Sequence, residues 1–184
     1  MRIIAGTARS LPLKTVSGME TRPTSDRIKE TLFNMLQNDV GGAYFLDLFS
    51  GSGQMGLEAL SRGANYCVFV DNGKKQAECI QDNISFTKFD KQSLLMKMDV
   101  VSAIASLEGK YQFDIIFMDP PYNQQLEKEV LERLANSSIL KEDTLIVVEA
   151  SLDTDFDYLK DYGFAMEKYK KYKTNAHIFI KRDK

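Results

Sequence analysis

The fold of this chain is decided by residues 44–56, which read Y-F-L-D-L-F-S-G-S-G-Q-M-G. The first five residues are apolar apart from Asp47 and predict a buried strand, and the glycines that follow predict a tight turn into a helix. Gly51 and Gly53 let the backbone turn sharply and approach a ligand, and the first N–H groups of the helix have no partners within it. A strand, a glycine turn and a helix in this order are typical of a nucleotide-binding α/β domain.

Outward from this stretch, strands and helices alternate along the chain. Near-continuous apolar runs alternating with helical segments predict an α/β fold with a mostly parallel sheet that helices cover on both faces. The last two apolar runs are close enough to form an antiparallel hairpin at the sheet edge, which makes seven strands. The expected strands are 44–48, 66–70, 93–98, 113–118, 144–148, 164–172 and 176–181, and the expected helices lie at about 54–62, 73–86, 100–108 and 124–137.

The first 40 residues predict a small N-terminal extension ahead of a main domain at 41–184. Two short extended pieces at 2–4 and 13–16 are expected to form a hairpin. A helix capped by Thr24 or Ser25 should then run through apolar positions at helical spacing.

The glycine turn predicts a nucleoside-type cofactor, and two interpretations of it compete. A G-x-G-x-x-G pattern begins at Gly51, with Asp71 twenty residues later, and this is also the pattern of a dinucleotide site. Asp47 favours S-adenosylmethionine over NAD, because a carboxylate here suits an ammonium and a sulfonium better than a pyrophosphate. A hydride-transfer enzyme usually needs a placed acid or base, and the one histidine, His177, lies far along the chain.

The expected cofactor-binding residues lie at the ends of the first three strands. Asp71 ends the second strand, where its carboxylate can accept hydrogen bonds from ribose hydroxyls. Asp99 follows the third strand and could accept from an adenine amino group, although a cap for the helix at 100–108 explains it equally well. The expected set is Asp47, Phe49, Ser50, Gly51, Gly53, Asp71, Asn72 and Asp99.

A second candidate corner, Asp119-Pro120-Pro121-Tyr122, follows the fourth strand. Proline fixes its own φ and keeps the residue before it extended, so Asp119 and Pro120 are both expected outside the helical region. The Asp119 carboxylate and the Pro120 carbonyl then form a rigid pair of acceptors. Such a pair can hold the nitrogen of an aromatic amine pyramidal, with its lone pair aimed at an activated methyl group. Tyr122 can stack on the base, so the four residues are the expected catalytic set.

Composition narrows the chemistry further. The 184 residues include one histidine and two cysteines, and no apolar run is long enough to span a bilayer. We therefore expect no metal site, buried reduced thiols, no signal peptide, no membrane association and a cytoplasmic location. The net charge of −2 hides two basic ends, residues 1–30 and 168–184. These ends could grip a phosphate backbone or could be inert, solvated surface.

Several motifs together resemble a known family. D-L-F-S-G-S-G at 47–53 and D-P-P-Y at 119–122 look like the two signature motifs of amino methyltransferases that act on nucleic acids. R-P-T-S-D-R at 22–27, running into E-T-L-F-N-M-L, resembles the RsmD-type bacterial family that makes N2-methylguanine in 16S ribosomal RNA. M-R-I-I-A-G at 1–6 and G-L-E-A-L-S-R-G-A at 56–64 are similar to that family as well, so the likeness runs from Met1 to about Glu149.

The resemblance implies a Rossmann-like class I methyltransferase fold with S-adenosylmethionine as the cofactor. It implies that residues 119–122 hold a guanine and that Arg22, Thr24 and Arg27 lie near cofactor and RNA, although capping and surface pairing are alternative roles for the arginines. Two departures from the family's pattern are visible. Asp71 stands where Glu is more common, and Lys173 replaces the glycine of a Tyr-Gly-Thr turn, which puts the local turn geometry in question.

The expected function is transfer of a methyl group to N2 of a guanine in 16S rRNA. The implied partner is that RNA within an assembled or assembling small ribosomal subunit, and nothing demands more than a monomer. Amino methyltransferases of DNA adenine or protein glutamine share the D-P-P-Y corner, and a non-catalytic RNA-binding module could share the fold. An NAD-dependent enzyme would share the glycine pattern.

Overall fold

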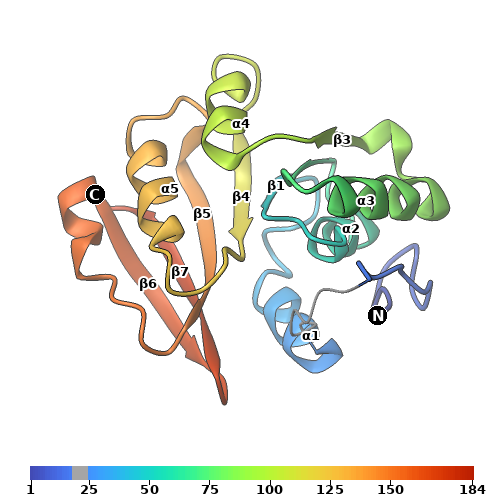
Figure 1. Cartoon of the computed structure of the whole chain (residues 1–184). Coiled ribbons are helices and arrows are strands. Elements are labelled where there is room, and N and C mark those ends of the chain that lie inside the picture. The colour runs from blue at the N-terminus through green and yellow to red at the C-terminus, as the bar shows by residue number, and fades with distance from the viewer. Residues whose placement is uncertain (18–24) are drawn as a thin grey trace.

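The structure is a computed structural model that describes residues 1–17 and 25–184 (Figure 1). Two of the expected RNA-contacting residues, Arg22 and Thr24, lie outside the described residues. No helix in the described ranges is long and apolar enough to cross a membrane.

A seven-stranded sheet forms the centre of the described part of the chain, in the order β3-β2-β1-β4-β5-β7-β6. The first five strands of this order are parallel, and β7 is antiparallel to both β5 and β6. This confirms the predicted mostly parallel sheet with a C-terminal hairpin. Strand order reverses between β1 and β4, where ligands bind in such sheets. The strands are β1 (Tyr44–Leu48), β2 (Tyr66–Val70), β3 (Ser93–Met96), β4 (Phe113–Met118), β5 (Leu140–Ser151), β6 (Phe164–Lys171) and β7 (Asn175–Arg182).

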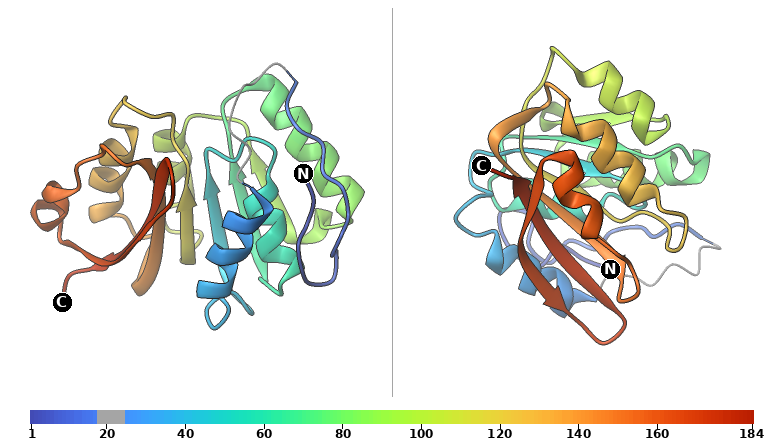
Figure 2. Two further views of the ribbon diagram at one scale, coloured as in Figure 1. Left: turned by 90° about the horizontal axis from the view of Figure 1, so that it is seen from below. Right: turned by 90° about the vertical axis from the view of Figure 1, so that its left-hand side faces the viewer.

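Helices cover both faces of the sheet (Figure 2). The core on one face receives apolar side chains from the N-terminal segment and from α1, α2 and α3, and the core on the other face from α4, α5 and the 3-10 helix η2. Gly56 lets α2 approach β2 closely, because a Cβ atom at this position would lie 2.4 Å from the Phe69 ring. The helices are α1 (Asp26–Met35), α2 (Gln54–Ser61), α3 (Lys74–Thr87), α4 (Val100–Leu107), α5 (Leu126–Ala135), and the 3-10 helices η1 (Asp90–Gln92) and η2 (Asp157–Tyr162).

The element boundaries differ most at β5, which begins at Leu140 and not at Thr144. Its first residues include the exposed Glu142 and Asp143, whose charges hide the strand from a search for apolar runs. Thr144 lies within the register shift between Leu140 and Leu145, where its hydroxyl donates to the Phe113 carbonyl and so replaces a ladder hydrogen bond. The third strand is shorter than expected and ends at Met96.

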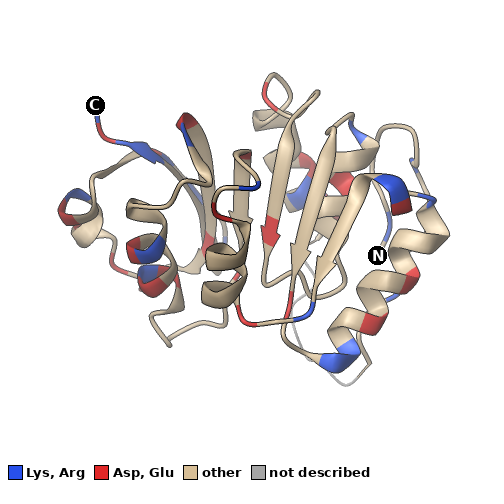
Figure 3. Ribbon diagram, turned by 90° about the horizontal axis from the view of Figure 1, so that it is seen from above, with Lys and Arg blue, Asp and Glu red and all other residues tan. Residues whose placement is uncertain are grey.

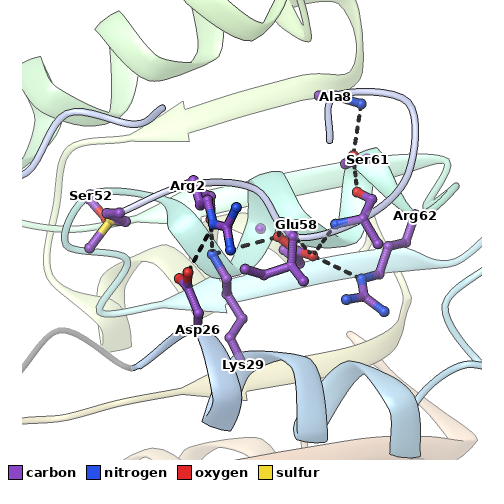
Figure 4. Close-up of polar contacts among 12 residues, drawn as sticks. Arg2, Ala8, Asp26, Lys29, Ser52, Glu58, Ser61 and Arg62 are labelled. Atoms are coloured by element: carbon purple, nitrogen blue, oxygen red, sulfur yellow. Dashed lines mark hydrogen bonds and ion pairs between the residues drawn. The ribbon is translucent and has the colours of Figure 1, made fainter. Parts of the chain in front are cut away.

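The expected N-terminal hairpin is short: Arg2 and Pro12 form an antiparallel bridge, and the Ile3 and Leu13 N–H groups donate to the Leu11 and Met1 carbonyls, each at 3.0 Å. Side chains of α2 attach this segment to the rest of the domain (Figure 4). The buried Glu58 carboxylate accepts from the Ile4 N–H at 2.9 Å and from the Ala5 N–H at 3.2 Å. The Ser61 hydroxyl donates to the Ala5 carbonyl at 2.6 Å. The extension therefore shares the core with the sheet on the α2 side.

The first helix is attached to the same carboxylate. Lys29 of α1 is fully buried, its Nζ atom lies 3.6 Å from Glu58 Oε2, and it donates to the Arg2 carbonyl. Burial lowers the pKa of Lys29, and the Glu58 charge opposes that shift. Arg62 approaches the other oxygen of Glu58 at 2.9 Å. Ser25 caps α1 by accepting from the Ile28 N–H, as one of the two predicted caps.

Candidate active site

The glycine loop between β1 and α2 adopts the predicted tight turn. Gly51 and Gly53 have φ angles of +60° and +82°, which residues with a Cβ atom rarely adopt. Ser50 attaches the loop to β1 and β2, because its N–H donates to the Val70 carbonyl at 2.9 Å and its hydroxyl donates to the Asp47 carbonyl. A Cβ atom at Gly51 would meet nothing within 4 Å, so this side of the loop is open to a ligand.

Asp47 lies near the end of β1 with its carboxylate buried beneath the loop. Its exposed fraction is 1%, and its Oδ2 atom accepts from the Gly56 N–H at 3.1 Å. Burial raises the pKa of Asp47 to about 8, the Gly56 hydrogen bond opposes the shift, and the charge of Asp71 reinforces it. Because a buried carboxylate is ionised more easily beside a cation, this position favours a positively charged ligand.

Asp71 follows β2 and joins that strand to the glycine loop. One of its carboxylate oxygens accepts from the Gly51 N–H and the other from the Gly73 N–H, each at 2.9 Å. An ionised carboxylate has about four acceptor positions, so two remain for hydroxyl groups. The predicted ribose contact fits this geometry and stays a prediction.

A pocket of about 190 Å³ opens beside these groups, at the carboxyl ends of β1, β2 and β3. Its wall contains four expected cofactor residues, Phe49, Asp71, Asn72 and Asp99. Apolar faces beside a few polar groups fit the base and ribose of a nucleoside. The sequence patterns did not single out the other lining residues, which are Met98, Val100, Val101, Leu126, Glu129 and Val130.

Two pocket residues have backbone or capping roles of their own. Phe49 has a φ of +60°, a conformation that costs a bulky residue on the order of 1–3 kcal/mol and that gathers at ligand sites. Asp99 caps α4, where its side chain accepts from the Ser102 N–H at 2.9 Å. Hydrogen bonding to the side chain and then to the backbone of Ser102 lowers the pKa of Asp99. The capping alternative is thus confirmed, while contact with an adenine stays a prediction.

The Asp119–Tyr122 corner reaches the same edge of the sheet. Leu48 at the end of β1 is paired with Met118 at the end of β4, so the glycine loop and the corner leave neighbouring strands together. Pro120 is buried, whereas Asp119 and Tyr122 are partly exposed. The turn that follows holds Asn123 and Gln125 at positive φ before α5 begins. The two motifs, separated in sequence, therefore lie at the same edge of the sheet.

The Asp119 carboxyl lies among other acids. Burial raises its pKa well above the ordinary value, and the charges of Glu149 and then Asp47 raise it further. A ligand that carries positive charge would reverse these effects and favour the ionised form. The two buried carboxyls of Asp47 and Asp119 therefore both favour a positively charged group nearby.

A polar cluster that no motif indicated lies next to Asp119, on β5 and β7. Glu149 accepts from the Asn175 amide at 2.8 Å, and its second oxygen lies 3.1 Å from Nε2 of His177. His177 is a fully buried strand residue, and its ring contacts the Tyr172 ring edge-on at 5.3 Å between centroids. Glu149 and His177 are direct partners in the antiparallel ladder, a register that the sequence does not state.

Among the described residues, positive groups expected to meet RNA lie on α1 and on the C-terminal hairpin. Arg27 is exposed on α1. Lys168 and Lys170 are paired in β6 with Phe179 and His177 of β7, so they share a sheet face with the polar cluster. Figure 3 shows Lys and Arg positions in blue on the strand that leads to the C-terminus.

The known proteins that this chain is similar to are described as methyltransferases wherever their names state an activity. The family model described as conserved hypothetical protein 95 matches residues 1–181. YlbH of Bacillus subtilis, whose name assigns it provisionally to the rRNA methyltransferases, is 39% identical over 150 residues, which are 81% of this chain and 82% of that protein. The ribosomal RNA small subunit methyltransferase D of Haemophilus influenzae is 34% identical over 154 residues, covering 83% of this chain and 80% of its own. The solved structure of yhhF from Escherichia coli, provisionally described as a methyltransferase, superposes with a TM-score of 0.85 at 30% identity, covering 100% of this chain and 98% of that one.

Proposed function

Because this chain belongs to the family described as conserved hypothetical protein 95, we propose that it transfers a methyl group from S-adenosylmethionine to the N2 amino group of a guanine in 16S rRNA. It is an rRNA methyltransferase, as relatives over more than four-fifths of its length are named. The observation that carries the finer proposal is the meeting of the glycine loop and the D-P-P-Y corner at adjacent strand ends.

The methyl donor is S-adenosylmethionine, which supplies an activated methyl group on a sulfonium. The pocket at Phe49, Asp71, Asn72 and Asp99 has the size and lining for its nucleoside part. The raised pKa of the buried Asp47 fits a cationic amino-acid part beside the glycine loop. Ser50, Gly51 and Gly53 shape the backbone between these two ends.

The corner orients the amino group that is methylated. The Asp119 carboxylate and the Pro120 carbonyl accept from its two N–H groups, which draws the nitrogen toward a pyramidal geometry with its lone pair facing the methyl group. Pro121 stiffens the corner, and Tyr122 stacks on the base. The nitrogen becomes acidic only after it has attacked, so Asp119 takes the proton at that stage.

RNA as the substrate is supported by the names of the relatives and by the basic segments. We place Arg22, Thr24 and Arg27 near the RNA, with the extension at 1–40 as an RNA-contacting part of the molecule. A base in a duplex must be unstacked to reach the corner, so a loop or otherwise exposed guanine in an assembled or assembling small subunit is the favoured target. The protein acts as a monomer in this proposal.

The test is methyl labelling of purified small subunits from cells that lack this protein, with free rRNA, DNA and total protein as parallel substrates. The expected result is one labelled guanine in 16S rRNA, identified by mass spectrometry as N2-methylguanine. Label confined to DNA or to protein glutamine would reject the proposal. No label on any substrate, together with tight binding of RNA, would identify a non-catalytic binding module.

A further inference from the structure

Glu149 stands beside Asp119 at the carboxyl edge of the sheet. Met118 and Val148 are partners in the parallel β4–β5 ladder, so Asp119 and Glu149, the residues that follow them, lie side by side. The residues two positions earlier in both strands face the core on the side of α1, α2 and α3, and side chains alternate along a strand. The carboxyl groups of Asp119 and Glu149 therefore point to the same face, and Glu149 is the nearby charge that raises the pKa of Asp119 most.

Two side chains of β7 hold the Glu149 carboxylate in place. The Asn175 amide donates to Oε1 at 2.8 Å, and Nε2 of His177 lies 3.1 Å from Oε2. These contacts use one acceptor position on each oxygen, and an ionised carboxylate offers about four. Asp119 is partly exposed, and Glu149 is buried beside it with an exposed fraction of 6%.

The cluster is not a fully satisfied packing arrangement. Among the described residues, the His177 Nδ1 atom and the Tyr172 hydroxyl are buried without a hydrogen-bond partner. An unpaired polar atom buried next to two neighbouring carboxyls costs free energy, and carboxyls with strongly shifted pKa values cluster at functional sites. The polar cluster of Glu149, Asn175 and His177 is thus a candidate for ligand recognition as well as for holding β5 to β7.

The edge of guanine matches two neighbouring carboxylates. In guanine the amino group on C2 lies next to the N1–H donor, whereas the amino groups of adenine and cytosine lie next to a ring nitrogen that is an acceptor. A carboxylate binds the first pattern and repels the second. We propose that Glu149 is the specificity-determining residue, accepting from guanine N1–H while Asp119 and Pro120 bind the amino group. His177 and Asn175 are then positioning residues for Glu149.

This inference rests on the proposed function, and 2-aminopurine tests it separately. That base keeps the amino group on C2 but carries an acceptor at N1. Small subunits are reconstituted with 16S rRNA that has guanosine or 2-aminopurine ribonucleoside at the mapped methylation site, and initial rates of methyl transfer are compared. The wild type should prefer guanosine by at least about 100-fold, since a site that binds an N–H group rejects analogues that lack it.

Glu149→Gln should reduce this preference to within about 10-fold, because an amide can donate to N1 of 2-aminopurine. The ratio isolates the N1 contact, since the loss of O6 in 2-aminopurine affects both proteins alike. His177 can accept the amide N–H by carrying its proton on Nδ1, so the variant is expected to fold. Glu142→Gln, an exposed position on the same strand, is the matched control and should keep the wild-type ratio.

The outcomes separate the two proposals. An unchanged preference in Glu149→Gln that binds S-adenosylhomocysteine normally overturns the role of Glu149 and leaves the proposed function standing. Failure of the wild type to methylate guanosine overturns both. If Glu149→Gln does not fold, His177→Phe removes the Nε2 contact while keeping a ring, and an unchanged preference in that variant overturns the inference equally.

Discussion

Replacing Asp47 by Asn should stabilise the protein in the absence of cofactor, by an amount that grows with pH. The pKa of Asp47 is raised to about 8 by burial, whereas in the unfolded chain it returns to the ordinary value of 3.8. Between these pH values the folded protein keeps a proton that the unfolded chain has released, so wild-type stability falls as pH rises. Asn carries no charge to bury, and its side-chain oxygen can still accept from the Gly56 N–H.

The size of the effect follows from the shift. One pKa unit corresponds to 1.36 kcal/mol, so the advantage of the variant is near zero at pH 4 and has an upper limit of about 5 kcal/mol at pH 8. Relaxation of the loop and entry of water would reduce this figure by a factor of 2 or so. An advantage of about 2–5 kcal/mol at pH 8 is the expected outcome.

Urea unfolding at several pH values between 5 and 8.5 measures the free energy of unfolding of both proteins. The difference between them should widen with pH and then level off above pH 8. A difference in the free energy of unfolding that stays constant over this range, or a wild type that is the more stable protein at pH 8, would refute a raised pKa at the buried Asp47 carboxyl. The same variant should bind S-adenosylmethionine more weakly than the wild type, because the anionic partner of the cation is gone.

Three further outcomes are expected. Asp119→Ala should abolish methyl transfer while S-adenosylhomocysteine affinity stays within a few-fold in calorimetry, and full activity would remove Asp119 from the mechanism. Binding of S-adenosylmethionine at pH 7 should release up to about one proton, because a cation lowers the raised pKa of Asp47. Calorimetry in two buffers of different ionisation enthalpy counts the protons released, and zero release contradicts this linkage. Glu58→Ala should lower the free energy of unfolding by about 3–5 kcal/mol, because it leaves the buried Lys29 ammonium without its anionic partner. The double variant Glu58→Ala with Lys29→Met should recover much of the loss. A Glu58→Ala variant as stable as the wild type would show that the ion pair does not stabilise the fold.

Local motifs were sufficient to predict the backbone conformation of much of the candidate site. The turn at Gly51 and Gly53 needs only the conformational freedom of glycine, and the Asp119–Tyr122 corner needs only the restriction that proline imposes on itself and its neighbour. The alternation of apolar runs and helices was likewise sufficient for the mostly parallel sheet. Each of these properties is encoded within a few consecutive residues.

Other features depend on contacts between distant residues. The N-terminal segment is held by Glu58, 54 positions away from Ile4, and no local sequence pattern indicates this contact. Glu149 and His177 meet across 28 positions because the β5–β7 register pairs them. A shift of that register by one residue would turn one of the two side chains to the other face of the sheet.

The fold class, the cofactor loop and the Asp119–Tyr122 corner can be predicted from short stretches of sequence, because backbone conformation and apolar periodicity are local properties. Which charged side chains are buried together, from Lys29 with Glu58 to Glu149 with Asp119 and His177, follows only from the packing of the folded chain. The physical reason is that the free energy of a buried charge depends on what lies within a few ångströms of it, and packing of the whole chain sets those neighbours.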